Sequence, residues 1–259
     1  MNEFLEKREI YETRCPSNQN IFDRFDGGFV SIFPNVITRP GNFNATHDDR
    51  VKWVNEVFPL KDKTILECGP LELGHSYMMQ NYGASNIISV ESNWNCYIKC
   101  LVVKDIYKLD KVEIKFGDIN KYIENTCDLR VDFALVSGIL YHLENPVQLI
   151  KNLSNVANNI FIWTHVYDPS SPTQSIQDVS YTTITFEDEV YEGAKQKYRE
   201  NSTSTLYCGG TFYISFWITE NSLYKALNKY GFNNIIKNEA LSDKSHPNGP
   251  SISVFCSKT

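Results

Sequence analysis

The sequence predicts an α/β domain built on a doubly wound, mostly parallel sheet. From residue 60 onward, short β-branched runs alternate with stretches of helical period, which is typical of parallel strands joined by crossover helices. The last two strands are separated by the turn-rich segment SDKSHPNGPS, which predicts a hairpin and hence an antiparallel final strand. With 259 residues, of which 42% are hydrophobic, the chain is long enough to bury a core.

The core of the sheet is predicted from five apolar runs and the helical stretches between them. The strands are expected at residues 64–68, 86–91, 112–116, 131–136 and 159–164. The helices are expected at residues 76–82, 94–107, 119–125 and 146–156. The last of these has a clear start, because Asn145 is a good N-cap and Pro146 suits the first helical position.

Three further segments complete the predicted single domain. Residues 1–46 have no clear period but many phenylalanines, so we expect an amino-terminal arm packed on the core at 47–166. Residues 167–217 interrupt the alternation and are rich in Ser, Thr, Tyr and Gly, which predicts an insertion. Residues 218–259 are expected to form a helix at 219–230, closed by Gly231, and a hairpin of strands at 234–238 and 251–256.

Charge, cysteines and hydropathy exclude several classes of protein. The net charge is −6 and the basic residues are dispersed, which disfavours a nucleic-acid partner. The seven cysteines are scattered without zinc spacing, so we expect no metal and a reduced, cytoplasmic protein. No apolar stretch reaches the roughly 18 to 20 residues of a membrane span, and the charged start predicts neither a signal peptide nor a membrane partner.

The turn after the first strand of the sheet, in the segment KTILECGPLELG, is where a nucleotide-like ligand would approach the backbone. The sequence lacks GxGxxG, which counts against NAD or FAD, and lacks GxxxxGK[ST], which excludes a Walker-type phosphate loop. The next strand ends at Glu91, placed to accept hydrogen bonds from ribose hydroxyls. Asp118 and Ile119 follow the third strand, and Ser137 and Gly138 follow the fourth. Together these strand ends predict an adenosine pocket.

The chain resembles class I S-adenosylmethionine-dependent methyltransferases. The resemblance covers residues 47–256 and rests on four segments in the family's order: ILECGP, SVES, FGDI and ALVSGILYHLENP. It implies a Rossmann-like methyltransferase sheet and S-adenosylmethionine as cofactor. One departure concerns the family's first motif, D/E-x-G-x-G-x-G, where this chain has Glu67, Gly69, Leu71 and Leu73 before glycine returns at Gly74.

The resemblance also implies which residues bind each part of the cofactor. An acid faces the ammonium of its methionine end, a second acid holds the ribose, and two backbone segments frame adenine and the sulfonium. These residues are Glu67 and Gly69 at the methionine end, Glu91 at the ribose, Asp118 and Ile119 at adenine, and Ser137 and Gly138 beneath the sulfonium.

A methyl transfer to oxygen gains from a base, and three histidines are expected at the active edge of the sheet. His165, at the end of the fifth strand, is our first candidate, and His142 is the second. His75, at the start of the first helix, serves either in this chemistry or as a cap for the motif loop. Asp168 either orients an imidazole or begins an Asp-Pro turn.

The insertion holds many aromatic residues, which either stack on an acceptor and close as a lid or, as we favour, pack the insertion onto the sheet. The residues concerned are Tyr181, Tyr191, Tyr198, Tyr207, Tyr213 and Trp217, with Gly209 and Gly210 among them.

The sequence therefore predicts an S-adenosylmethionine-dependent O-methyltransferase acting on a small polar acceptor. The variant motifs LExGPLExGHSYM and SGxLYH are similar to those of bacterial methyltransferases associated with surface, capsular polysaccharide synthesis, so a hydroxyl of a nucleotide-activated sugar or polysaccharide precursor is the expected acceptor. The SGxLYHLxxP segment also resembles enzymes that modify the tRNA wobble uridine, an alternative that the acidic charge opposes. A non-catalytic S-adenosylmethionine-binding protein is the third reading.

Overall fold

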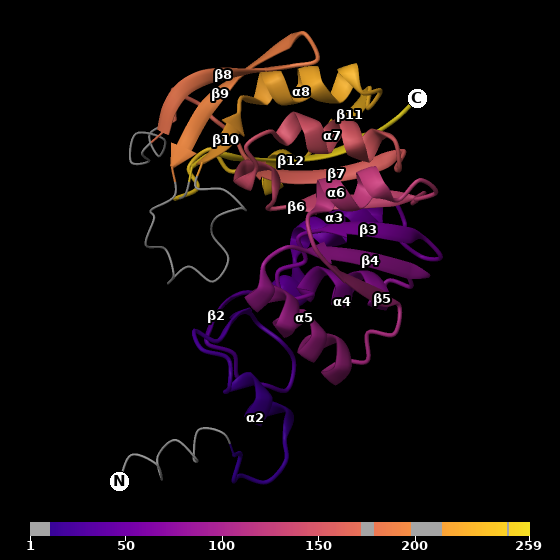
Figure 1. Cartoon of the computed structure of the whole chain (residues 1–259), viewed down its shortest axis with the longest axis vertical. Helices are drawn as coiled ribbons and strands as arrows, with labels where there is room; N and C mark the ends of the chain where they lie inside the picture. Colours follow the sequence, from indigo (N-terminus) through magenta and orange to yellow (C-terminus); the bar gives the residue numbers. More distant parts are fainter. Residues whose placement is uncertain (1–10, 172–178, 198–213, 248) are drawn as a thin grey trace.

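A seven-stranded sheet forms the centre of the computed structural model, which describes residues 11–171, 179–197, 214–247 and 249–259 (Figure 1). Its strand order is β11-β12-β7-β6-β3-β4-β5. Five neighbouring strands, from β7 to β5 in this order, pair in parallel, and β12 runs antiparallel to both of its neighbours, so that β11 runs in the same direction as those five. The strands are β3 (Thr64–Cys68), β4 (Asn86–Glu91), β5 (Val112–Phe116), β6 (Phe133–Ser137), β7 (Asn159–His165), β11 (Asn234–Lys237) and β12 (Ser251–Ser257). This arrangement confirms the predicted doubly wound, mostly parallel sheet with an antiparallel final strand.

In the described part of the chain, six helices cover the two faces of this sheet. Successive strand residues point to opposite faces, so Ile65 belongs to one apolar core and Leu66 to the other. The core around Ile65 contains apolar residues of α3 (Asp49–Val57), α4 (Gly74–Asn81) and α5 (Trp94–Ile106). The core around Leu66 contains those of α6 (Ile119–Asn125), α7 (Pro146–Ser154) and α8 (Glu220–Lys229).

The boundaries of β6 and α4 differ from those predicted. β6 begins at Phe133, because the Asp132 carboxylate accepts the N–H of Thr64 at 2.8 Å in place of a backbone carbonyl. Val131 makes only an isolated bridge to Ala157. α4 begins at Gly74, two residues early, since the left-handed residue Leu73 already turns the chain into the helix. The Asn145 side chain caps α7 ahead of Pro146, as predicted.

The insertion after β7 contains a separate antiparallel sheet, ordered β10-β9-β8, which the sequence analysis did not predict. Its strands are β8 (Val179–Phe186), β9 (Glu189–Lys197) and β10 (Ile214–Ile218), and Figure 1 shows them beside α8. Glu187 and Asp188 both have positive φ, which gives the two-residue turn between β8 and β9 the twist that hairpins favour.

Two of the six aromatic residues singled out in the insertion are buried where it packs on the sheet. Tyr191 lies in the core around Leu66, and Trp217 is 3% exposed, whereas Tyr181 is mainly exposed. The remaining residues named there, together with Cys208, lie outside the described residues: Tyr198, Tyr207, Gly209, Gly210 and Tyr213.

The amino-terminal arm consists of α2 (Asn18–Phe22), β1 (Phe29–Ser31), β2 (Pro40–Phe43) and the short 3-10 helix η1 (Ala45–His47). Its phenylalanines pack on one another and on the core: Phe22 and Phe29 have ring centroids 4.3 Å apart, and Phe33 stacks on Tyr107 of the α5 end at 5.4 Å. The arm is therefore attached to the domain by buried aromatic contacts.

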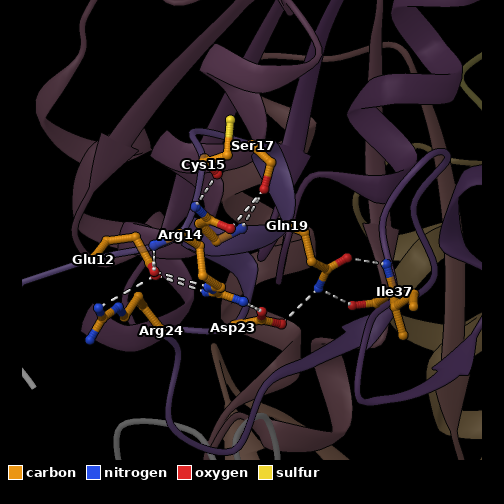
Figure 2. A network of polar contacts seen from close by, with 9 residues as sticks. Glu12, Arg14, Cys15, Ser17, Gln19, Asp23, Arg24 and Ile37 are labelled. Atoms are coloured by element: carbon orange, nitrogen blue, oxygen red, sulfur yellow. Dashed lines mark hydrogen bonds and ion pairs between the residues drawn. The ribbon is translucent and has the colours of Figure 1, made fainter.

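A polar network holds the outer part of this arm together (Figure 2). Arg14 forms ion pairs with Glu12 at 2.8 Å and with Asp23 at 2.5 Å. The Gln19 amide both donates to the carbonyl of Ile37 at 2.9 Å and accepts from its N–H at 2.7 Å. These contacts join the residues before α2 to α2 itself and to the chain before β2.

Across the part of the chain that the structure describes, no helix has both the length and the apolar character needed to cross a membrane.

Candidate functional site

The candidate site lies along the carboxyl ends of five neighbouring parallel strands. The strand registers place Glu67 beside Ser89, Glu91 beside Phe116, and Ser137 beside Trp163. The sheet order reverses at β3, whose two neighbours lead the chain to opposite edges. Such a switch point is where open α/β sheets bind their ligands.

The loop after β3 has a backbone conformation unusual for its sequence. Gly69, Leu71 and Leu73 all have positive φ, at 68°, 58° and 63°, and only the first is glycine. A left-handed leucine is strained and persists where surrounding contacts fix it. Here Gly69 N–H donates to the Val90 carbonyl at 3.0 Å, which ties the loop to β4.

Glu67 is completely buried at the end of β3. One of its oxygens, Oε2, accepts hydrogen bonds from the hydroxyls of Ser76 and Ser89, the latter at 2.7 Å. The other, Oε1, has no hydrogen-bond partner among the described residues. Burial raises the pKa of this carboxyl. Since a buried acceptor left unpaired is costly, this oxygen fits a cationic or N–H donor of a bound molecule, such as the predicted methionine ammonium.

Glu91 ends β4 and supports the same loop. Its Oε2 accepts the N–H of Leu71 at 3.2 Å, and its Oε1 accepts the N–H of Asn93 at 2.8 Å. Burial raises its pKa, although the backbone hydrogen bonds act in the opposite direction. A carboxylate has about four lone-pair sites, so both oxygens keep capacity for the ribose hydroxyls that the sequence assigned to them.

Asp118 and Ile119 follow β5, the edge strand of the sheet. One Asp118 oxygen caps α6 by accepting the N–H of Lys121 at 3.0 Å. Ile119 is buried in the core below it. Asp118 therefore has a structural role besides the predicted contact with adenine. Its second oxygen accepts no hydrogen bond from the described residues and keeps capacity for that contact.

Ser137 ends β6, which lies beside β3, and Gly138 follows it. The Ser137 hydroxyl is buried and has no partner among the described residues. Gly138 has a φ of 85°, and its N–H donates to the Trp163 carbonyl at 2.9 Å. A side chain at Gly138 would contact the ring of Trp163 and the hydroxyl of Tyr141, so glycine leaves the backbone open to a ligand.

His165 lies among aromatic rings at the end of β7. Its Nδ1 is 2.8 Å from the carbonyl of Gly249, so Nδ1 carries the hydrogen and Nε2 is an acceptor. The ring stacks on Trp217 with centroids 5.2 Å apart and meets Tyr141 edge-on at 4.7 Å. Burial, and then the charge of His246, lower the pKa of His165 to about 4. His165 is thus neutral at physiological pH.

His142 lies close to His165 but in a different setting. Its ring is 4.1 Å from that of Tyr141, in the turn after β6. Burial, followed by the charge of His165, lowers its pKa to about 3. The structure therefore brings both predicted base candidates to one cluster, which we call the aromatic cluster: Tyr141, His142, Trp163, His165, Trp217 and His246. Asp168 is at a turn beyond it, where its side chain accepts the N–H of Ser170.

Two residues of the site, Asp48 and Arg50, were missed in the sequence analysis. The Asp48 carboxylate caps α3 and lies 2.8 Å from Nε2 of His75. Arg50 donates to the same carboxylate from Nε and Nη2. The segment THDDR contains a visible N-cap signal at Asp48, but no sequence pattern links it to a histidine 27 residues away.

No group of three or more His, Cys, Asp or Glu side chains within the described ranges is arranged to hold a metal ion. The predicted metal independence stays a prediction. The residues on the active edge fit an organic cofactor with a cationic group, because such a group would satisfy the orphaned oxygen of Glu67 and favour its ionised form.

No family model matches the sequence, and no curated protein matches it at a significant level. Solved structures do match. The N-terminal domain of EvdMO1, crystallised in the presence of SAH (S-adenosylhomocysteine) and D-fucose, is 20% identical with a TM-score of 0.72, over 98% of this chain and 97% of that one. Against EvdMO1 as a whole, the alignment covers 47% of the longer chain.

Magnesium protoporphyrin IX methyltransferase (ChlM) from Synechocystis PCC 6803, with bound SAH, is 11% identical with a TM-score of 0.55, over 98% of this chain and 93% of that one. TehB from Haemophilus influenzae is 16% identical with a TM-score of 0.55, over 85% of this chain and 65% of that one. At these identities the likeness is one of fold, and the chain has the Rossmann-like methyltransferase fold that the sequence predicted.

Proposed function

We propose that this protein is an S-adenosylmethionine-dependent methyltransferase that methylates a hydroxyl of a nucleotide-activated sugar or polysaccharide precursor. The observation that carries the proposal is the buried, unpartnered Oε1 of Glu67 at the switch point of a methyltransferase-like sheet. A buried carboxylate oxygen without a donor is costly, and the ammonium of the cofactor would satisfy it.

The ends of the neighbouring strands would contact the other parts of that cofactor. Glu91 would hold the ribose, Asp118 and Ile119 would frame adenine, and Gly69 would face the methionine end. Ser137 and Gly138 would lie beneath the sulfonium, where glycine leaves room for a close backbone approach. The bound cofactor supplies an electrophilic methyl group, so no metal or covalent nucleophile is required.

His165 is our candidate for the base, with His142 as the second. As the oxygen–methyl bond forms and the carbon–sulfur bond breaks, the hydroxyl proton would pass to Nε2 of His165. The backbone carbonyl of Gly249 fixes the required tautomer by accepting from Nδ1. The lowered pKa keeps this nitrogen unprotonated at physiological pH, although it also limits its strength as a base.

A sugar acceptor is supported by the surroundings of His165. The rings of Tyr141 and Trp217 meet edge-to-face with centroids 5.9 Å apart, and the buried indole N–H of Trp217 has no partner among the described residues. An apolar ring face with a few unsatisfied polar groups is the usual composition of a small-molecule site. EvdMO1, whose N-terminal domain was crystallised with SAH and D-fucose, shares this fold. We place the reaction in the cytoplasm and in the synthesis of surface polysaccharides.

The test is a methyl-transfer assay with isotopically labelled S-adenosylmethionine and a panel of nucleotide-activated sugars. We expect a product heavier by one methyl group, detected by mass spectrometry, for at least one sugar. Unmodified tRNA serves as the second acceptor. Methylation of tRNA with no turnover of any sugar would overturn the acceptor class, and retention of cofactor binding without any transfer would indicate a binding protein.

A further inference from the structure

The small antiparallel sheet of the insertion presents one face to the aromatic cluster. Residues opposite each other in an antiparallel pair have their side chains on the same face of the sheet, as do residues two apart on one strand. β10 pairs with β9 so that Trp217 is opposite Ala194, two residues before Gln196. Trp217 and Gln196 therefore share a face as diagonal neighbours. Because Trp217 stacks on His165, this is the face toward the cluster.

Gly249, in the loop before β12, orients Trp217 within this face. A Cβ atom at Gly249 would lie 2.6 Å from Cζ3 of Trp217, so the loop backbone lies directly against the six-membered ring of the indole. Nε1 is on the opposite edge of the indole, buried and without a partner among the described residues. The carbonyl of the same glycine is 2.8 Å from Nδ1 of His165. One glycine thus orients both the indole donor and the candidate base.

Gln196 supplies a complementary acceptor. The residue is 8% exposed, and its Nε2 donates to the carbonyl of Lys197 at 3.2 Å, which leaves Oε1 as the acceptor end of the amide. Oε1 is buried and has no hydrogen-bond partner among the described residues. Diagonal neighbours on a sheet lie about 7 to 8 Å apart, within reach of aromatic and long side chains. The indole N–H and this oxygen nevertheless do not bond to each other.

An unpaired donor and an unpaired acceptor on one buried face indicate a bound group that both accepts and donates, because each group left unpaired is costly. A hydroxyl does both with a single oxygen. The hydroxyl of Ser137, beside Trp163 of the aromatic cluster, is a third buried polar group without a partner in the described part of the chain. Several unpaired groups beside stacked rings fit a molecule with several hydroxyls.

We propose that Trp217 and Gln196 bind a second hydroxyl of the acceptor, one that is not methylated, while the reacting hydroxyl lies at His165. The bound hydroxyl accepts from Nε1 of Trp217 and donates to Oε1 of Gln196. This inference rests on the proposed function and deepens it: the acceptor is a diol or polyol, and the sheet β10-β9-β8 selects it. A site built to hydrogen-bond a hydroxyl rejects molecules that lack it, since its own polar groups then stay unpaired.

The first experiment observes the indole N–H directly. The chain has four tryptophans, so protein labelled at the indole nitrogen gives four side-chain signals, and the signal lost in Trp217→Phe belongs to Trp217. UDP-glucose, UDP-galactose, GDP-mannose and dTDP-rhamnose are titrated with SAH present, and UDP, GDP and dTDP are the controls without a sugar. We expect the Trp217 signal to shift with at least one sugar nucleotide and with no control. A signal that responds to none of them would leave a water molecule as the partner and overturn the inference.

The second experiment measures methyl transfer to the sugar nucleotide that shifts this signal. Gln196→Leu and Trp217→Phe each remove one of the two polar groups. Gln148→Leu is the matched control, because Gln148 lies on α7 and donates to Glu124 at 2.9 Å. We expect KM for the sugar nucleotide to rise at least about 10-fold in both site variants, with a smaller change in kcat, and to stay unchanged in the control. Thermal unfolding without ligand checks that each variant is folded.

The outcomes separate this inference from the proposed function. If a sugar nucleotide is methylated and both site variants keep the wild-type KM, the inference is overturned and the proposed function stands. If sugar nucleotides shift the Trp217 signal but the wild type methylates none of them, the sugar site is supported and the proposed methyl transfer is overturned. If they neither shift the signal nor accept a methyl group, both fall.

Discussion

Glu72 and Lys99 form a buried ion pair beneath the motif loop, with Lys99 Nζ 3.0 Å from Glu72 Oε1 and neither side chain more than 2% exposed. The same carboxylate accepts the backbone N–H groups of Val30 and Ser31 at 3.1 and 2.8 Å. Lys99 also lies 5.1 Å from the ring centre of Phe29. One carboxylate thus joins the arm strand β1, the loop after β3 and the helix α5.

The first prediction concerns this ion pair. Lys99→Met removes the cation and leaves the Glu72 carboxylate buried with only its two backbone donors. We expect the free energy of unfolding to fall by about 3 kcal/mol, because breaking a buried pair leaves an uncompensated charge. Urea unfolding followed by circular dichroism measures this loss. The double variant Glu72→Gln with Lys99→Met should recover part of it, whereas additive losses would show that the two residues are not coupled.

Cofactor binding by Glu91 gives the second prediction. Glu91→Gln keeps the shape of the side chain and one acceptor oxygen but loses the charge. The affinity for SAH should fall by about 1.5 to 3 kcal/mol, the scale of hydrogen bonds to a charged group. Calorimetry with the variant measures the change, and unaltered affinity would remove Glu91 from the ribose site.

The base is the subject of the third prediction. His165→Asn retains an N–H that can donate to the Gly249 carbonyl but has no basic nitrogen. We expect the turnover number to fall by at least about 100-fold, with the affinity for SAH unchanged. Steady-state kinetics with the identified acceptor provide the measurement. If turnover is nearly normal and only the Michaelis constant rises, His165 binds the acceptor, and His142 becomes the residue to test.

The pH dependence of the reaction gives the fourth prediction. The base acts unprotonated, and burial lowers the pKa of His165 to about 4 from its ordinary 6.5. The acid limb of kcat/KM should therefore fall near pH 4 and not near pH 6.5, so activity should be nearly constant between pH 7 and about pH 5.5. The profile is measured where circular dichroism shows the native fold. A limb at pH 6.5 would mean that a solvated histidine takes the proton.

The stability of the folded protein should also depend on the titration of His165. Because its folded pKa lies below its unfolded value, the unfolded chain binds the extra proton between pH 6.5 and about 4. Protonation of His165 in the unfolded chain should thus lower the free energy of unfolding of the wild type by up to about 1.4 kcal/mol per pH unit as the pH falls through this window. Relative to the wild type, His165→Asn should unfold with a shallower dependence on pH there, as urea titrations at several pH values would show.

The strands of the central sheet were predictable because each is a short apolar run between turn residues. β3, β4 and β5 have the predicted bounds, and β12 pairs antiparallel with β11 as the predicted hairpin implied. β6 begins late because the N–H of Thr64 donates to the side chain of Asp132, a hydrogen bond that no periodicity encodes. The sheet in the insertion was missed although residues 181–186 alternate between exposed and half-buried, because half of the residues of β8 are Thr or Ser and the apolar alternation is weak.

The candidate site was predictable only where function follows from position at a strand end. Glu91 and Ser137 could be named because parallel strands bring their carboxyl ends to one edge, and Glu67 was named through the resemblance of its motif to that of a known family. The contact between Asp48 and His75, 27 residues apart, depends on how α3 packs beside α4. The low pKa of His165 likewise follows from its burial among rings that three separate segments supply, so the sequence could not indicate it.

The binding of the cofactor is tested most directly by titrating SAH into the wild-type protein in a calorimeter. We expect saturable binding of one molecule per chain, and a midpoint of thermal unfolding that rises with SAH concentration, because only the folded state has the strand-end site. The absence of both heat and thermal stabilisation at millimolar SAH would show that the strand ends do not bind this cofactor.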